Sequence, residues 1–206
     1  MRPPTRLVKM FLAVLLMGGV LAACTPKKYP LEVQYRPPLP SNVLAGREVS
    51  LSVHDMRAPK AFLTATARKA LKNFAGYFSL IVKHESQADD LIGAFPLASL
   101  WREVFKHKLA TEGVAVAAAG EAREIAIQIE LLDCTLDLVD RKWVIRMGYR
   151  TNLLKADKIL AREVIQGQAE RVRVISYKDA EKVMAELLTD VTNQLSVTKL
   201  FQQAGL

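Results

Sequence analysis

Apolar and polar residues alternate through much of the second half of the chain, which predicts an antiparallel meander of long strands. If residues 140–141 form a two-residue turn, the apolar positions on either side of it face one another across two strands. The alternation over 125–131 has the opposite parity, so we expect a bulge near Leu131 and Leu132. A third strand is expected over 159–174. The predicted apolar pairs are Leu138 with Trp143, Leu136 with Ile145, Cys134 with Met147 and Leu132 with Tyr149.

Helical spacing of apolar residues predicts two longer helices. The first covers about 97–109, with Pro96 near its start and Gly113 where a C-terminal cap belongs. The second covers 176–195 and carries a continuous apolar stripe, and a short helical turn follows it at 198–203.

The first half of the body is patterned less clearly. Residues 49–53 alternate as a strand does, residues 61–74 fit a helix or a loop, and 77–82 fit a short strand, so the pattern leaves 58–95 open. The order of elements predicts an α+β fold, in which helices pack on one face of a mostly antiparallel sheet. We expect one such domain over 47–206.

The first 23 residues have the organisation of a signal peptide. Arg2, Arg6 and Lys9 form a basic segment, and 10–23 form an apolar run without a charge. At ~1.5 Å per helical residue this run spans about 21 Å, whereas the hydrocarbon core of a bilayer is roughly 30 Å thick. The run is therefore predicted to direct secretion rather than to remain as a membrane span.

The end of this segment, Leu21-Ala22-Ala23-Cys24, resembles the lipobox of bacterial lipoproteins. The resemblance implies that the Cys24 thiol receives diacylglycerol, that cleavage falls between Ala23 and Cys24, and that acyl chains such as palmitate hold the protein on a membrane. Thr25, where a retained lipoprotein would carry Asp, implies the inner leaflet of the outer membrane, with the body in the periplasm. The alternative is an unmodified cysteine near an ordinary secretory cleavage site.

Proline is dense after Cys24. Five prolines lie within 25–46, and proline disfavours both helices and central strands. We therefore expect 24–46 to form a semi-extended tether between the membrane and the body, at ~3.1 Å per residue where it is polyproline-like.

Charge and cysteine content argue against nucleic-acid binding and against a disulfide bond. The formal net charge is +8, and removal of the three leader cations leaves 26 Lys and Arg against 21 Asp and Glu, which is too weakly basic to predict nucleic-acid binding. With Cys24 acylated, Cys134 has no disulfide partner, and its place in an alternating strand predicts a buried thiol.

The residues that usually carry chemistry are scattered. His54, His84 and His107 stand apart, and the sequence holds no zinc-protease helix, nucleophile elbow or phosphate-binding glycine loop. The pairs Asp89-Asp90 and Asp133/Asp137 fit a polar loop and a solvated strand face. We therefore predict no catalytic residue, no metal site and no cofactor.

Lys142, Arg146 and Arg150 share one face of the second meander strand. They form a candidate surface for an anionic ligand or an acidic partner. In the plainer alternative, Arg146 lies opposite Thr135 and beside Asp133 and Asp137, so exposed pairs across the strands neutralise its charge at little net energy.

Several local strings resemble the YajG family of lipoproteins: the lipobox, "SLWREVFKHKLATEGVAV", the strand over 125–138 and "LLTDVTNQLSVTKLF". The resemblance implies a fold and a location and carries over no active site. Two functions follow: a non-enzymatic accessory or assembly module that binds another envelope protein, or a lipid or glycolipid carrier that resembles auxiliary lipoproteins of transport systems. The carrier predicts an apolar cavity between helix and sheet with Arg146 or Lys142 at its rim.

Overall fold

The computed structural model describes residues 27–84, 88–118, 120–174 and 176–206. These residues form a five-stranded sheet in the order β5-β2-β6-β7-β8 and a three-stranded sheet in the order β1-β3-β4. The strands are β1 (Tyr29–Tyr35), β2 (Glu48–Asp55), β3 (Phe74–Val82), β4 (Asp90–Phe95), β5 (Ala115–Val116), β6 (Ile125–Val139), β7 (Lys142–Lys155) and β8 (Lys158–Val172). The helices are α2 (Ala65–Ala70), α3 (Leu97–Thr111), α4 (Ser176–Gln194) and α5 (Val197–Gln203).

The predicted meander forms the main part of the larger sheet. Strands β6, β7 and β8 pair antiparallel, and the expected partners Leu138–Trp143, Leu136–Ile145 and Cys134–Met147 are confirmed. Asp140 and Arg141 make the tight turn with φ of 46° and 65°, as a primed hairpin turn requires.

The bulge is also confirmed, and it corrects one pair. The register shifts between Leu131 and Asp133, so Tyr149 lies opposite Leu131 and not opposite Leu132 as predicted. Leu132 is the extra residue of the bulge, and the apolar series passes from Leu131 to Cys134 across it.

Strand β1 lies where a tether was predicted, so the boundary at residue 47 is wrong. Leu31, Val33 and Tyr35 are completely buried, and β1 pairs in parallel with β3. Pro30 is the proline inside this strand, and the register shifts there, because proline has no N–H for the ladder. The other prolines of the segment stand before or after β1, so their density does not prevent the strand.

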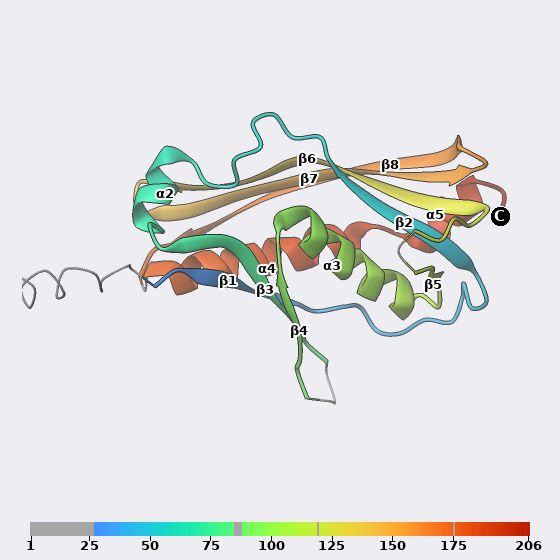
Figure 1. Ribbon diagram of the computed structural model, residues 1–206, viewed down its shortest axis with the longest axis horizontal. Helices are drawn as coiled ribbons and strands as arrows, with labels where there is room; N and C mark the ends of the chain where they lie inside the picture. The colour runs from blue at the N-terminus through green and yellow to red at the C-terminus, as the bar shows by residue number, and fades with distance from the viewer. Residues whose placement is uncertain (1–26, 85–87, 119, 175) are drawn as a thin grey trace, which may run out of the picture.

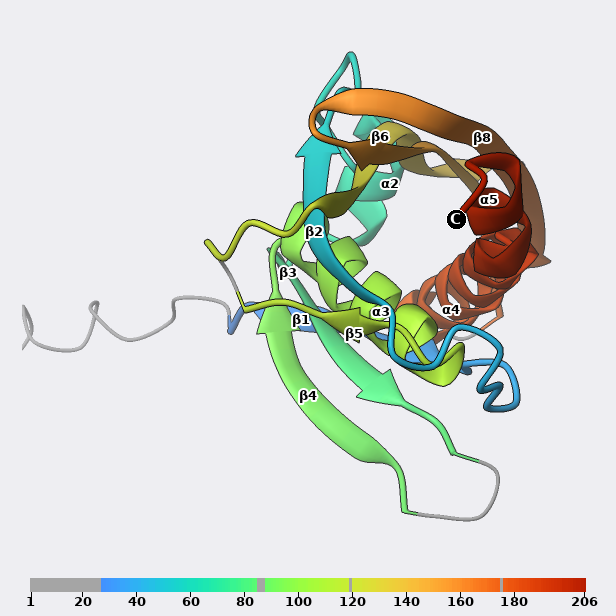
Figure 2. The same cartoon turned by 90° about the vertical axis from the view of Figure 1, so that its right-hand side faces the viewer.

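Helices α3 and α4 pack on one face of the five-stranded sheet, which curves around them in Figure 2. Trp101 and Phe105 of α3 meet Tyr149 of β7, with ring centroids 5.5 and 5.1 Å apart. The Tyr149 hydroxyl donates a hydrogen bond of 2.8 Å to the Val191 carbonyl of α4. This cluster joins both helices to the centre of the sheet, as the predicted fold class requires.

The stretch that the pattern left open contains three elements. Thr64 caps α2 by accepting a hydrogen bond of 3.3 Å from the amide of Ala67. Strands β3 and β4 then form a hairpin that projects from the body (Figures 1 and 2). The buried core as a whole runs from Leu31 to Phe201, so a chain from Thr25 to Leu206 contains all of the described core.

Candidate functional site

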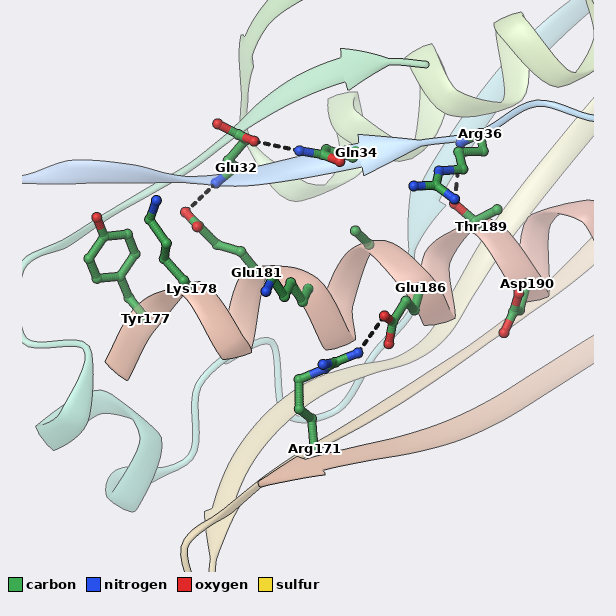
Figure 3. Close-up of a pocket in the computed structure, with 12 residues that line it drawn as sticks. Glu32, Gln34, Arg36, Arg171, Tyr177, Lys178, Glu181, Glu186, Thr189 and Asp190 are labelled. Atoms are coloured by element: carbon green, nitrogen blue, oxygen red, sulfur yellow. Dashed lines mark hydrogen bonds and ion pairs between the residues drawn. The ribbon is translucent and has the colours of Figure 1, made fainter. Parts of the chain in front are cut away.

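A groove of about 880 Å³ lies along α4, between the edge strands of the two sheets. Figure 3 shows β1 on one side of α4 and Arg171 of β8 on the other, with polar side chains of α4 directed into the space between them. The apolar face of α4 is buried against the sheets. Its polar face is therefore directed outward, where it lines the groove. The lining is Glu32, Gln34, Arg36, Arg171, Tyr177, Lys178, Glu181, Lys182, Ala185, Glu186, Thr189 and Asp190.

Side chains of α4 bind the free edge of β1. The Glu32 amide donates to Glu181 Oε1 at 2.8 Å, and the Arg36 amide donates to Thr189 Oγ1 at 3.3 Å. The Arg36 carbonyl accepts from Asn193 Nδ2 at 2.9 Å, and Asn193 Oδ1 also accepts from the Tyr35 hydroxyl at 3.0 Å. The bonds to the backbone of Glu32 and Arg36 satisfy amide and carbonyl groups that would otherwise be open to another strand. They also fix the position of β1 relative to α4.

The groove carries both signs of charge. Arg171 Nη2 lies 2.5 Å from Glu186 Oε1, and this ion pair connects β8 to α4. Burial raises the pKa of the Glu181 carboxyl above its ordinary value, while its bond from the Glu32 amide opposes the shift. Lys178 and Lys182 stand exposed on the same helix, so acidic and basic groups alternate along the groove.

The predicted basic surface lies on the outer face of the five-stranded sheet, opposite the face that packs against α3 and α4. Lys142, Arg146 and Arg150 lie on the opposite side of β7 from the buried residues Trp143, Ile145, Met147 and Tyr149. Arg146 pairs with Asp133 at 3.4 Å, as the plainer alternative expects, and Lys142 and Arg150 form ion pairs with Glu170 and Glu130, each at 2.7 Å.

Asp137 has different neighbours from those expected. Its carboxylate accepts hydrogen bonds from Thr64 and from Thr66, the latter at 2.6 Å, and these bonds lower the pKa of Asp137. This carboxylate therefore holds the start of α2 against β6 rather than pairing with Arg146.

The remaining predicted positions divide into two groups. Ala23 and Cys24 lie outside the described residues. Cys134 is fully buried, as predicted, and burial raises the pKa of its thiol to about 12.

Within the described ranges, no cluster of three or more His, Cys, Asp or Glu side chains could hold a metal ion. No helix in these ranges has the length and apolar character needed to cross a bilayer.

The groove was not predicted from the sequence. One of its walls is β1, and the prolines of that segment predict a tether instead of a strand. The alternation of Leu31, Val33 and Tyr35 with Glu32, Gln34 and Arg36 was the available signal, and it places the polar set on the groove side.

No protein-family model matches this sequence, and no curated protein matches it. A DUF330-family protein from Xanthomonas campestris has a similar fold, with a TM-score of 0.52 and 13% identity over 84% of this chain and 96% of that one. Weaker likenesses include a minor lipoprotein from Acinetobacter baumannii (TM-score 0.39, 10% identity, 77% of this chain and 94% of that one). Another is lipoprotein GNA1162 from Neisseria meningitidis (TM-score 0.30, 10% identity, 72% and 96%). At 13% identity, the likeness to the Xanthomonas protein shows a similar fold and nothing about function.

Proposed function

We propose that this protein is a lipid-anchored lipoprotein of the cell envelope whose body binds another envelope protein in a non-enzymatic accessory or assembly role. The anchor is supported by three sequence features that follow one another as in a lipoprotein signal peptide: the basic segment, the short apolar run and the lipobox that ends at Cys24. By the same resemblance, the acyl chains lie in the inner leaflet of the outer membrane and the body faces the periplasm.

The groove along α4 is the observation that carries the binding role. Its walls are held by hydrogen bonds between α4 and β1, so the surface is preorganised and loses little entropy on binding. Its lining alternates acidic and basic side chains, which suits a polypeptide with complementary charges. The partner is therefore proposed to be a protein that presents a charged segment of mixed sign.

The carrier alternative requires a different cavity. It predicts an apolar space between helix and sheet with Arg146 or Lys142 at its rim, whereas the groove along α4 is lined mainly by charged and polar residues and contains neither of these two. A second hollow, of about 240 Å³ beside α3, is lined by Arg102, Glu103 and Lys106 among others and also excludes both. The described geometry thus favours a protein partner over acyl chains.

The resemblance to the YajG family rests on the local strings and the lipobox. These strings lie in α3 and β5, in β6, and in the second half of α4 with α5, and they contribute many residues of the buried core. We propose that the chain is a YajG-like lipoprotein on those strings alone.

The binding role is tested by photocrosslinking in cells with the full-length chain. A photoreactive residue replaces Lys182, which is exposed in the groove, and as a matched control replaces Gln168, which is exposed on the outer sheet face. The proposal expects a discrete protein adduct from position 182 and none from position 168. Adducts with lipid alone at position 182, equal protein adducts at both positions, or no adduct at either would contradict it.

A further inference from the structure

The body begins close to the proposed acylation site. Tyr29, the first residue of β1, is the fifth residue after Cys24. An extended chain spans at most ~3.6 Å per residue, so this linker reaches about 18 Å at full extension. A body on so short a linker must stay beside the bilayer, and one particular end of it must face the lipid.

Three contacts identify the segments that share this end with Tyr29. The Tyr29 amide donates to the Asn73 carbonyl at 2.9 Å, and its ring lies 5.2 Å from that of Tyr177 in the first turn of α4. The Arg173 amide donates to the Arg141 carbonyl at 2.8 Å, which joins the end of β8 to the turn between β6 and β7. Figure 1 shows these segments and α2 at the end where β1 begins, and the C-terminus at the opposite end. We call this the amino-terminal end.

Apolar side chains are exposed on the amino-terminal end. The exposed fractions are 47% for Val139, 55% for Val172, 79% for Val174 and 38% for Tyr177. Val139 lies opposite Lys142 in the sheet, and Lys142 lies opposite Val172, so the two valines share one row across three strands. Exposed apolar side chains gathered in this way favour contact with another apolar phase.

Unpaired basic side chains accompany them. Lys69, Lys72, Arg141 and Arg173 are exposed, and none of them forms an ion pair within the part of the chain that the structure describes. Lys27 and Lys28 add two exposed charges next to Tyr29, whereas Asp140 contributes one negative charge from the turn. The balance is clearly positive.

From this arrangement we infer that the amino-terminal end lies on the membrane surface and binds anionic lipid headgroups. Basic residues attract the headgroups, and the adjacent valines and Tyr177 enter the interface, as on other peripheral membrane surfaces. The inference rests on the proposed anchor. The short linker brings the amino-terminal end, and not the C-terminal end, to the bilayer, so the membrane is the surface that this end contacts. Its consequence is that the groove along α4 has one end near the lipid, at Tyr177, and extends away from it.

The test uses a soluble chain that begins at Thr25, which contains the whole described core and lacks Cys24. Binding is measured by co-sedimentation with vesicles of phosphatidylglycerol and phosphatidylethanolamine, and with neutral phosphatidylcholine vesicles. The test variant is Lys72→Glu with Arg173→Glu. The matched control is Lys158→Glu with Lys199→Glu, which reverses two exposed charges at the start of β8 and in α5, the elements at the C-terminal end in Figure 1. Circular dichroism checks the fold of both.

We expect the parent chain to bind the anionic vesicles much more strongly than the neutral ones. Each basic residue near a membrane surface changes the affinity about fivefold, so the test variant should bind about 25-fold more weakly or worse, and the control should match the parent. Equal binding to both vesicles, no binding, or an equal loss in the control would overturn the inference. Because this chain has no Cys24, the outcome is independent of whether the natural protein is acylated.

Discussion

The backbone amide of Glu32 in β1 donates a hydrogen bond of 2.8 Å to the carboxylate of Glu181 in α4. The two residues are 149 positions apart in the sequence. The bond joins the first strand to the last long helix, and it forms part of the wall of the groove. It also puts a carboxylate into a half-buried site, where its charge is costly.

Glu181 should therefore make stability depend on pH. Burial raises its pKa above the ordinary 4.5, so the carboxyl favours the folded state when protonated, and this contribution is lost as the pH rises through the folded value. Glu181→Gln removes the charge and keeps an acceptor for Glu32. In urea unfolding between pH 4 and 7, the Gln variant should gain stability relative to the wild type as the pH rises above 4.5.

Glu181→Ala serves as the comparison. It removes the acceptor as well as the charge, so it should cost about 1 kcal/mol relative to the Gln variant. A Gln variant whose stability relative to the wild type falls as the pH rises would contradict the account.

Gly167 of β8 lies directly against α4. A Cβ added there would stand 2.9 Å from Val191 Cγ1 and 3.0 Å from Leu187 Cδ1. We expect Gly167→Ala to lower the free energy of unfolding by about 1–3 kcal/mol through overpacking. Gly148→Ala is the matched control on β7, because its nearest neighbour would be 3.4 Å away; it should be close to neutral in the same denaturant titration. Similar losses in both variants would show that the helix does not pack this closely.

The second hairpin turn carries residues that suit it poorly. Ala156 and Asp157 have φ of 47° and 63°, a conformation that favours Asn and Gly. Replacing the pair by Asn-Gly should stabilise the protein by about 1 kcal/mol, measured by thermal or urea unfolding. Ala161→Gly, in the extended part of β8, should instead destabilise it, and a gain there would count against a purely conformational cause.

Cys134 should be chemically silent in the folded protein. Its side chain has no exposed surface, and burial raises the pKa of the thiol to about 12, so little reactive thiolate is available. In the chain that begins at Thr25, a thiol reagent at pH 8 should label Cys134 only when urea is added. Rapid labelling without denaturant would mean that the bulge region opens readily.

Much of the fold could be predicted because its information is local. The facing apolar positions on either side of Asp140 and Arg141 define the β6–β7 register, and the change of parity near Leu131 reveals the bulge. The apolar spacing of α3 and α4 likewise identifies the helices. In each of these cases, residues close in the sequence determine the structure.

The remaining features depend on contacts between distant segments. The parallel pairing of β2 with β6 cannot be predicted from the sequence pattern of either strand alone. Strand β1 contains Pro30 and is followed by three more prolines. The density of prolines therefore predicts a tether, although Val33 and Tyr35 are completely buried. The groove was missed with it, because it exists only where β1 and α4 meet.

The anchor at Cys24 is tested most directly by the intact mass of the mature protein extracted from membranes. The account predicts a chain that begins at Cys24 and carries the added mass of a diacylglyceryl group and an amide-linked acyl chain. Cys24→Ser should abolish this species, while Cys134→Ala, the other cysteine, should leave it unchanged. A mature chain with an unmodified Cys24, or one cleaved at another residue, would contradict the account.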